Sequence, residues 1–358
     1  MSDLLVVGGG VMGMAVALEA LSKGVSVTLL EKDTCGAGAS QASAGILSPA
    51  GMSWSDASLN ALCWSGIRRY PAWIGVLQEC AKGDPELHME GVLYPVEAHT
   101  AERAESLLQV GLKGEWIKEQ TLGESFGWLR VPQALFIREE GRIHPRHLLY
   151  QLRDALIAKG CVIREGSEVV LLQGKEGSFS ATTSKGDHLQ ANRVVMTTGA
   201  WSLKSPQGWV PPVKPMRGQL IELHLLGENP PTHTLHGESA YMVPQGKGAL
   251  WIGSMVEDKG WDETIDRSIL HRRIARIAQW VPGICQAKIG EAWCGFRPGS
   301  PDDCPIIGAR EEEEGLFWAT GLFRNGILLA PEVASMFGAW WDGIRRKECP
   351  FSPDRFAS

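Results

Sequence analysis

The hydrophobic pattern at the start of the chain predicts a strand, a turn, a helix and a second strand. The chain opens with the unbroken apolar run "LLVV", which is typical of a parallel strand buried on both faces. Val11, Ala15, Leu18 and Leu21 then recur at helical spacing. "VSVTLL" is a second apolar run, and Glu31 ends it. This order favours the beginning of an α/β domain with a parallel sheet.

The turn between the first strand and the helix carries glycines at GxGxxG spacing, Gly8, Gly10 and Gly13. The first permits a tight turn, the second lets the backbone approach a pyrophosphate, and the third lets helix and sheet pack closely. The helix N-terminus favours a diphosphate. Glu31 stands where a carboxylate accepts hydrogen bonds from ribose hydroxyls. The pattern predicts a dinucleotide site; the alternative is a glycine-rich turn in an unrelated α/β domain.

The segment after Glu31 helps to distinguish which dinucleotide, NAD, NADP or FAD, is expected to bind. An acid at the strand end disfavours NADP, but it does not distinguish NAD from FAD. Residues 35 to 49, "CGAGASQASAGILSP", are mostly small, so the main chain can lie close against a flat ring system. A nicotinamide-binding domain would normally continue with another crossover helix. FAD is therefore predicted, and the alternative is a flexible surface loop.

The remaining pattern alternates between two kinds of structure. Residues 57 to 82 predict a helix over the sheet, and short strands and charged helices alternate from about Glu86 to Glu140. Residues 142 to 172 predict a helix and then a strand, with Pro145 in the first helical turn and Gly160 at the C-terminal end of the helix. "RVVMTTGAWS" is a buried strand that ends in a glycine turn. Residues 216 to 290 predict an antiparallel sheet, and the acidic run 311 to 314 a solvated turn between strands.

These elements predict two interleaved domains of an α/β protein. A Rossmann-type FAD-binding domain would take residues 1–85, 141–215 and 291–358, the chain returning to it from about Trp293. An α+β substrate-binding domain, built on an antiparallel sheet, would take residues 86–140 and 216–290.

Composition narrows the class of protein. The chain has 358 residues, an apolar share of 44% and a net charge of −6, which suits two domains with substantial cores and argues against disorder. Without a lysine or arginine run, nucleic acid is not an expected partner. The eight cysteines form no CxxC pair and the nine histidines lack metal spacing, so no metal is expected and a reducing cytoplasm is predicted. The first predicted strand begins at about residue 3, so a signal peptide is not expected. Glu19 and Glu332 interrupt the longest apolar stretches, so a membrane span is not expected.

Four motifs, in order, cover nearly the whole chain: "VVGGGVMG", "TTGAWS", "GFRPGSPDDCPIIG" and "ATGLFRNGILLAP". Together they resemble the D-amino-acid oxidase superfamily of FAD-dependent amine oxidoreductases, and the last two are most similar to the glycine oxidase branch, which serves thiamine thiazole biosynthesis. The resemblance implies a two-domain fold, non-covalent FAD, and oxygen as electron acceptor. It also implies oxidation of glycine, sarcosine or small D-amino acids to the imino or 2-oxo acid, with ammonia and hydrogen peroxide.

The resemblance further implies a substrate site. Arg297 matches an arginine that clamps the substrate carboxylate, and its planar fork suits bidentate contact. Tyr241 matches a tyrosine that helps to hold that carboxylate, Arg324 a second arginine near substrate and flavin, and Met255 an apolar wall residue. Backbone N–H groups of "NGIL", and a helix entered at Pro331, would face the negative charge of reduced flavin.

The contacts to FAD are implied in the same way. Val11 and Met12 match the diphosphate turn, and Glu31 and Lys32 match the ribose site. The other matches are Ala39, Ser40, Ala44, Gly45 and Ile46 along the isoalloxazine, Val169 on the adenine-side strand, Gly199 in the glycine turn, and Leu322, Phe323, Arg324, Asn325, Gly326, Ile327 and Leu328 beside the pyrimidine ring.

Several readings compete with these assignments. Arg297 would be structural if it paired with Asp302 or Asp303, Arg324 could be a surface side chain, and Tyr241 and Met255 could be packing residues. No side chain is placed as an obvious general base, and His144 is expected to begin a helix.

Departures from the family pattern concern the flavin environment. Leu322 replaces a histidine and Ile46 a methionine, either of which could change substrate choice. Cys294, near the covalent flavin position of sarcosine oxidases, is expected to be an inert buried thiol. Two rival functions remain at this point: a dehydrogenase that passes electrons to a quinone or carrier, and a flavoprotein subunit without turnover. A homo-oligomer is left open.

Overall fold

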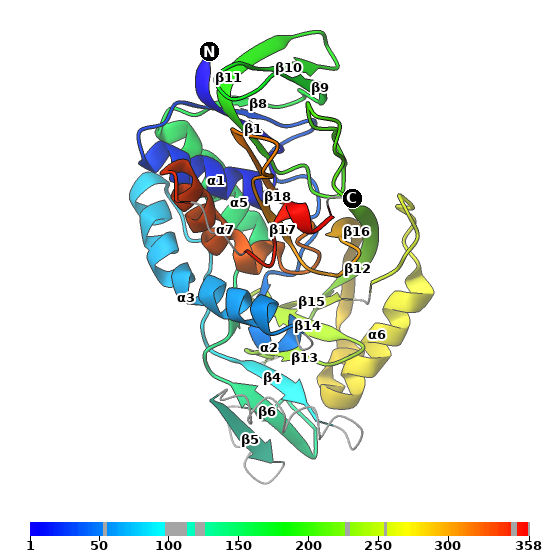
Figure 1. Cartoon of the computed structure of the whole chain (residues 1–358). Coiled ribbons are helices and arrows are strands. Elements are labelled where there is room, and N and C mark those ends of the chain that lie inside the picture. The colour runs from blue at the N-terminus through cyan, green and yellow to red at the C-terminus, as the bar shows by residue number, and fades with distance from the viewer. Residues whose placement is uncertain are drawn as a thin grey trace.

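The first sheet contains the parallel strands that the opening of the chain predicts, β18, β11, β1, β2 and β8, and antiparallel strands extend it (Figure 1). It is seen in a computed structural model that describes residues 1–52, 56–96, 113–118, 126–225, 230–253, 256–344 and 349–356. Its strand order is β17-β18-β11-β1-β2-β8, and β10 and β9 extend it from β11. The strands are β1 (Ser2–Val7), β2 (Val27–Leu30), β8 (Val162–Arg164), β9 (Val169–Gln173), β10 (Phe179–Thr183), β11 (His188–Met196), β17 (Ile306–Gly308) and β18 (Leu316–Thr320).

Both faces of this sheet are covered, which explains its continuous apolar runs. Leu4 and Val6 of β1 pack towards the helices, whereas Leu5 and Val7 belong to the core shared with β9 and β10. Successive side chains of a strand point to opposite faces, so one run supplies both cores. The helices gathered on one side are α1 (Val11–Ser22), α2 (Pro49–Met52), α3 (Ala57–Cys80), α5 (Pro145–Ala158) and α7 (Gly326–Trp341).

The second sheet has the order β16-β12-β15-β14-β13-β4-β6-β5. Its pairs are antiparallel except for β13 and β4, which run parallel. Leu270 and Ile277 of α6 (Arg267–Trp280) pack in one core with the sheet residues Leu223 and Ile252. The strands are β4 (Val92–Pro95), β5 (Gly114–Lys118), β6 (Gln133–Ile137), β12 (Lys214–His224), β13 (Thr234–His236), β14 (Tyr241–Pro244), β15 (Ala249–Gly253) and β16 (Lys288–Gly299). The small elements are the ribbon of β3 (Ile46–Leu47) and β7 (Gly141–Arg142) and the 3-10 turns η3 (Pro282–Gln286) and η4 (Pro353–Phe356).

The mixed α/β class is confirmed, and two details of the sequence interpretation were wrong. The tail does not leave the second sheet at Trp293, because β16 pairs with β12 as far as Gly299. The acidic run 311–314 is a turn, but Glu313 within it is buried and accepts a hydrogen bond from Trp318 Nε1 (3.2 Å). A buried arginine, Arg310, lies 3.6 Å from the Glu313 carboxylate and balances its charge. The precise division into two domains stays a prediction.

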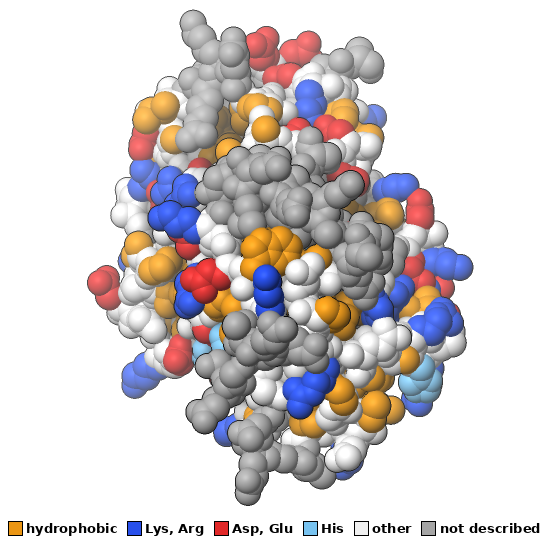
Figure 2. Space-filling model, turned by 90° about the horizontal axis from the view of Figure 1, so that it is seen from below, with side chains coloured by type: hydrophobic (Ala, Val, Ile, Leu, Met, Phe, Trp, Pro, Cys, Tyr) orange, Lys and Arg blue, Asp and Glu red, His pale blue; other side chains and the backbone are white. Residues whose placement is uncertain are grey.

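Charges of both signs share the surface. On the face seen in Figure 2, lysine, arginine and acidic side chains alternate around smaller apolar areas wherever the structure describes them. Within the described residues, none of the helices has the length and apolar character needed to cross a bilayer.

The contact between α3 and α7 fixes the helix that borders the cavity described below. Pro331 lies inside α7 and has no N–H, so the Ile327 carbonyl loses its helical partner. The hydroxyl of Tyr70, a fully buried residue of α3, donates to that carbonyl. One turn later, the buried Glu332 accepts from Ser65 Oγ (2.7 Å) and pairs with Arg69. Three polar contacts thus fix α3 and α7 in register.

Tyr70→Phe should destabilise the fold by about 1–3 kcal/mol, because it leaves the buried Ile327 carbonyl without its donor. The measurement is the free energy of unfolding in urea. Tyr150→Phe is the matched control, since Tyr150 is 69% exposed. Equal stability of the Tyr70 variant and its parent would show that the hydroxyl contact contributes nothing.

Candidate functional site

A large cavity lies where the first sheet meets the second. Its volume is about 670 Å³, and it is bordered by the ends of β1, β2 and β11, by the 38–46 loop, and by residues of β12 and β16. Clefts at the carboxyl ends of parallel strands are the usual ligand sites of α/β proteins. The predicted residues in its wall are Gly8, Gly10, Val11, Met12, Glu31, Lys32, Ala39, Ser40, Ala44, Gly45, Ile46, Val169, Gly199, Tyr241, Arg297, Leu322, Phe323, Arg324, Gly326 and Ile327.

The glycine turn leaves the start of α1 open towards this cavity. Gly8 has a positive φ of 107°, and a Cβ there would lie 2.4 Å from the Thr197 carbonyl oxygen. A Cβ on Gly13 would lie 1.9 Å from the Gly8 oxygen, so this glycine packs behind the turn and not in the wall. Gly10 caps α1 without a side-chain bond of its own. The Val11 N–H donates to Ser40 Oγ, so an anion at the helix start would meet the N–H groups that follow Val11.

Glu31 is held rigidly at the end of β2. Its Oε2 accepts from the Gly9 N–H (2.6 Å) and its Oε1 from the Asp33 N–H (2.9 Å). The carboxylate therefore ties the glycine turn to the strand end while it lines the cavity. A carboxylate has four lone-pair positions, so capacity remains for ribose hydroxyls.

The small-residue loop follows the cavity wall as the sequence predicts. Gly45 has a φ of 74°, and a Cβ there would lie 1.8 Å from the Ile143 oxygen. The Ile143 N–H in turn donates to the Gly45 oxygen (2.8 Å), beside the β3–β7 pairing. Ser40 Oγ accepts from the Val11 N–H (3.0 Å) and joins the loop to α1. The loop is thus a fixed wall and not a flexible surface segment.

The helix at the far end of the cavity begins earlier than predicted. α7 starts at Gly326, not at Pro331, which lies within it. Its first helical bond runs from the Leu329 N–H to the Asn325 oxygen (2.8 Å), so the preceding N–H groups are free of the helical ladder. The turn that leads into α7 is tight, because Phe323 adopts a positive φ of 47° and its N–H donates to the Pro298 oxygen (2.9 Å).

Some predicted residues do not reach the cavity wall. Asn325 and Leu328 are buried behind it, and the Asn325 Oδ1 has no hydrogen-bond partner among the described residues. Met255 lies outside the described residues.

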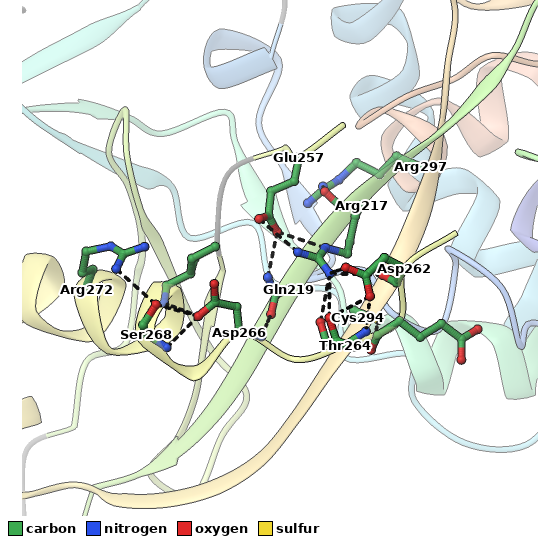
Figure 3. Close-up of polar contacts among 12 residues, drawn as sticks. Arg217, Gln219, Glu257, Asp262, Thr264, Asp266, Ser268, Arg272, Cys294 and Arg297 are labelled. Carbon is green, nitrogen blue, oxygen red and sulfur yellow. Dashed lines mark hydrogen bonds and ion pairs between the residues drawn. The ribbon is translucent and has the colours of Figure 1, made fainter. Parts of the chain in front are cut away.

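The substrate-side pair, Arg297 and Tyr241, lies over glycines of the second sheet. A Cβ on Gly218 would lie 2.0 Å from Arg297 Nη1, so the guanidinium occupies the space that a side chain would fill. Tyr241 lies over its strand partner Gly253 in the same way, with a Cβ there 2.0 Å from the hydroxyl. Figure 3 shows Arg297 beside Arg217, whose carbonyl accepts from Arg297 Nη1 (3.3 Å).

Charge at this end favours an anion. Burial raises the pKa of the Tyr241 hydroxyl, and the neighbouring Arg297 opposes that rise through its charge and a hydrogen bond. Tyr241 is therefore a neutral donor at ordinary pH. Arg324 is exposed at the rim, and its guanidinium lies 5.5 Å from the Phe323 ring centre.

The competing interpretations have different outcomes: Arg324 is exposed, as a surface side chain would be, although it also lines the cavity. Asp302 is paired with Arg355 (2.8 Å), so it does not engage Arg297. Cys294 is half-buried, its Sγ lies 3.4 Å from the Glu263 oxygen, and burial raises its pKa, as expected for an unreactive thiol. His144 caps α5 as predicted, accepting from the His147 N–H.

Sequence reasoning missed part of the cavity wall. Trp201, Trp261 and His236 also line it. Trp201 lies inside the quoted motif "TTGAWS", so its position next to a glycine turn was the available signal. Nothing in the local pattern distinguished Trp261 or His236 from ordinary packing residues.

A buried acid network behind the cavity was also missed. Glu140 has no exposed surface, and it accepts from the Ala50 N–H (2.6 Å) and the Tyr94 hydroxyl. Tyr94 is also hydrogen-bonded to Ser48, and its ring lies 5.6 Å from that of His236. Burial raises the pKa of Glu140 to about 8, so the acid is mostly protonated at neutral pH.

The chain matches a known family over nearly its whole length. Residues 3–340 fit the family described as DAO, FAD dependent oxidoreductase. A glycine oxidase of Pseudomonas aeruginosa is 30% identical, with 92% of this chain and 91% of that protein covered. A bifunctional protein ThiO/ThiG of Synechocystis is also 30% identical, over 99% of this chain but 54% of that protein. The chain therefore spans about half the length of such bifunctional relatives.

Solved structures agree with this match. The crystal structure of glycine oxidase from Geobacillus kaustophilus superposes with a TM-score of 0.90 at 26% identity, covering 99% of this chain and 98% of that one. An iminodiacetate oxidase from Chelativorans has a TM-score of 0.88 at 23% identity, which supports the fold alone.

The cofactor of the cavity is FAD. The glycine turn and Glu31 suit the adenosine diphosphate half, and the rigid loop of small residues suits a flat ring. The start of α7 suits the negative charge of a reduced flavin. The individual contacts of these residues with FAD stay predictions.

Glu31→Ala should weaken FAD binding ten- to a hundredfold, because lost hydrogen bonds to a charged acceptor are worth about 1.5–3 kcal/mol. The measurement is FAD titration of the apoprotein by flavin fluorescence. Glu115→Ala is the control, since the Glu115 side chain is 50% exposed and pairs with Arg138 at the surface of the second sheet. If both variants bind FAD like the parent, Glu31 is not the ribose acid.

Glu140→Gln should change how stability depends on pH. The pKa of Glu140 rises from an ordinary 4.5 to about 8 on folding, so the folded state holds the proton more tightly. Its contribution is present at low pH and is lost as the pH rises through the folded pKa, with a slope of up to ~1.4 kcal/mol per pH unit. Glutamine imitates the protonated acid, so this slope should disappear.

Urea unfolding at intervals between pH 5 and 8 would measure the effect of Glu140→Gln. The exposed neighbour Glu139 provides the control through Glu139→Gln, which should keep the parent's slope. An unchanged slope in the Glu140 variant would mean that this acid is ionised in the folded protein.

Proposed function

This chain belongs to the family DAO of FAD-dependent oxidoreductases, and we propose that it oxidises amino acids and that its substrates are glycine and similarly small amino acids. The products would be the imino or 2-oxo acid and ammonia, with hydrogen peroxide formed from oxygen. The observation that carries this proposal is the pairing of Arg297 with Tyr241 on the second sheet.

The geometry of that pair suits one small carboxylate. Arg297 lies flat over Gly218, so its position is fixed by the sheet and not by a flexible stem. Its fork can donate two parallel bonds to a carboxylate, and the Tyr241 hydroxyl can donate a third. Ala44 and Ile46 pack in one cluster with Tyr241, so a carboxylate held in this way would place its α-carbon near their side of the cavity.

The residues of the chain mainly orient the substrate. When bound, FAD supplies the hydride acceptor. Arg297 and Tyr241 fix the carboxylate, so a reaction between two molecules becomes a reaction within one complex. The apolar side chains of Ile46 and Leu322, both nearly fully buried, exclude water from the reacting carbon. Arg324 at the rim adds positive charge where an anionic substrate enters.

Several finer features belong to the same proposal. Oxygen as acceptor follows the glycine oxidase relatives, and peroxide formed per substrate in air would separate it from a quinone or carrier. Reduction of the flavin by an amino acid without air would exclude a subunit that lacks turnover. A role in thiamine thiazole formation, a cytoplasmic location and a homo-oligomer stay predictions.

Arg297→Lys should lower the second-order rate constant for flavin reduction by amino acids at least about thirtyfold, which corresponds to ~2 kcal/mol. Lysine keeps the charge but loses the fork, so the carboxylate is neither clamped nor aligned. The measurement is anaerobic stopped-flow reduction with glycine, sarcosine and small D-amino acids. FAD content should stay unchanged.

Two comparisons make the Arg297 test specific. Simple amines without a carboxylate should react equally with parent and variant. Arg138→Lys is the matched control, because Arg138 pairs with Glu115 at the surface far along the second sheet. Equal losses for amines and amino acids would mean that Arg297 supports the fold or the flavin and not the carboxylate.

A further inference from the structure

The segment that joins the second sheet to α6 reaches the cofactor cavity. Residues 256–266 connect the region after β15 to α6, and Trp261 within them lines the cavity although it is 48% exposed. Tryptophan is large and is on average well buried, so a half-exposed ring at a cavity rim has apolar surface that a bound ligand can cover.

The partners of Trp261 form a row across the cavity rim. Its ring lies 5.0 Å from Phe296 of β16 and 4.7 Å from Trp201, which follows β11 of the first sheet. On the other side of Trp201, Lys32 Nζ lies 3.9 Å from the indole centre. Lys32, Trp201 and Trp261 all line the cavity. The row thus runs from the end of β2, at the predicted ribose site, to the second sheet.

A buried arginine holds the 256–266 segment in place. Arg217 of β12 is 3% exposed, and its guanidinium pairs with both carboxylate oxygens of Glu257 (3.2 Å each). It also donates to Asp262 Oδ2 (2.7 Å) and to the Thr264 oxygen (3.0 Å), as Figure 3 shows. The backbones of Arg217 and Glu257 exchange two hydrogen bonds of 2.9 Å. Trp261 is therefore carried between fixed points.

A second side chain of β12 reinforces this arrangement. Gln219 donates to Glu257 Oε2 (2.7 Å) and accepts from the Asp266 N–H (2.7 Å), so it joins both ends of the segment (Figure 3). The same strand contacts the substrate arginine, because the Arg217 carbonyl accepts from Arg297. The segment's position is thus set by the strand that forms the substrate side.

We propose that residues 256–266 retain the cofactor: Trp261, held by Arg217 and packed on Trp201, closes the FAD cavity from the side of the second sheet. FAD would then have to part the two indole rings before it leaves, although nearly all its predicted contacts lie on the first sheet's side. Trp261 is a cofactor-retention residue and Arg217 a positioning residue.

The test measures the release of FAD from the holoprotein, which needs no substrate and so stands apart from the proposed activity. Trp261→Ala removes the ring, and the rate of FAD release, followed as the rise of free-flavin fluorescence on dilution, should increase about tenfold, as expected for loss of aromatic packing. Trp261→Phe keeps a ring and should stay within about threefold of the parent. Asp262→Asn weakens one contact of Arg217 and should give an intermediate rate.

A matched control lies on the same segment. Asp258 pairs with Lys214 at the surface and its side chain is 61% exposed, away from the contacts that Arg217 makes with Glu257, Asp262 and Thr264, so Asp258→Asn should release FAD like the parent. FAD release from Trp261→Ala at the parent's rate would overturn the proposal. So would equal acceleration in Trp261→Ala and Asp258→Asn, which would mean that the whole segment had loosened.

Thermal unfolding of the apoproteins separates retention from stability. The proposal requires that apo Trp261→Ala melts within a few degrees of the apo parent while its holoprotein melts clearly lower, because lost affinity removes ligand stabilisation. If Trp261→Ala does not fold, the Asp262→Asn variant decides: parent-like release of FAD from it would overturn the role given to Arg217 and its segment. An equal fall of both melting temperatures would show a structural role only.

Discussion

The site depends on how closely main chain and side chains approach one another where the two sheets meet. Three glycines of the second sheet make this possible: Gly218 under Arg297, Gly253 under Tyr241, and Gly295 under the loop residue Ala42. A Cβ on Gly295 would lie 2.5 Å from that of Ala42. Any side chain at these positions would push Arg297, Tyr241 or the loop away from the sheet. The charged side chains of the pocket can therefore take their positions only because these glycines leave the space free.

The charged groups then act from fixed positions. Arg297 is placed by β16 and by the Arg217 carbonyl, and Glu31 is placed by two backbone N–H groups. Such preorganisation matters because a group that need not reorient loses little entropy when a ligand binds. The acids that do not face the cavity are neutralised in other ways. Glu332 and Glu313 have arginine partners, whereas Glu140 is kept protonated by burial.

Short sequence motifs predicted those parts of the fold whose geometry is set by residues close together in the sequence. The strand, glycine turn and helix around Gly8 and the cap of α5 at His144 follow from short-range geometry, and both are confirmed. The start of α7 was misplaced because Pro331 was read as a helix-entry residue, whereas the carbonyl it leaves free is satisfied by Tyr70 from a distant helix. Trp261 and Glu140 were missed for the same reason. Their significance comes from neighbours far away in sequence, Trp201, Arg217 and Tyr94.

The strand order of the first sheet has a consequence for how the protein is made. β1 pairs with β11 at residues 191–196, and β11 in turn pairs with β18 at residues 316–318, so the centre of the sheet is completed only after β18 has been made. Pairings of such high sequence separation close slowly, because the entropy of a long loop must be overcome first. The glycine turn is synthesised early, whereas the walls contributed by β16 and α7 follow much later in the sequence. FAD can therefore be enclosed only after α7 has been made, and its binding then favours the completed fold over every earlier intermediate.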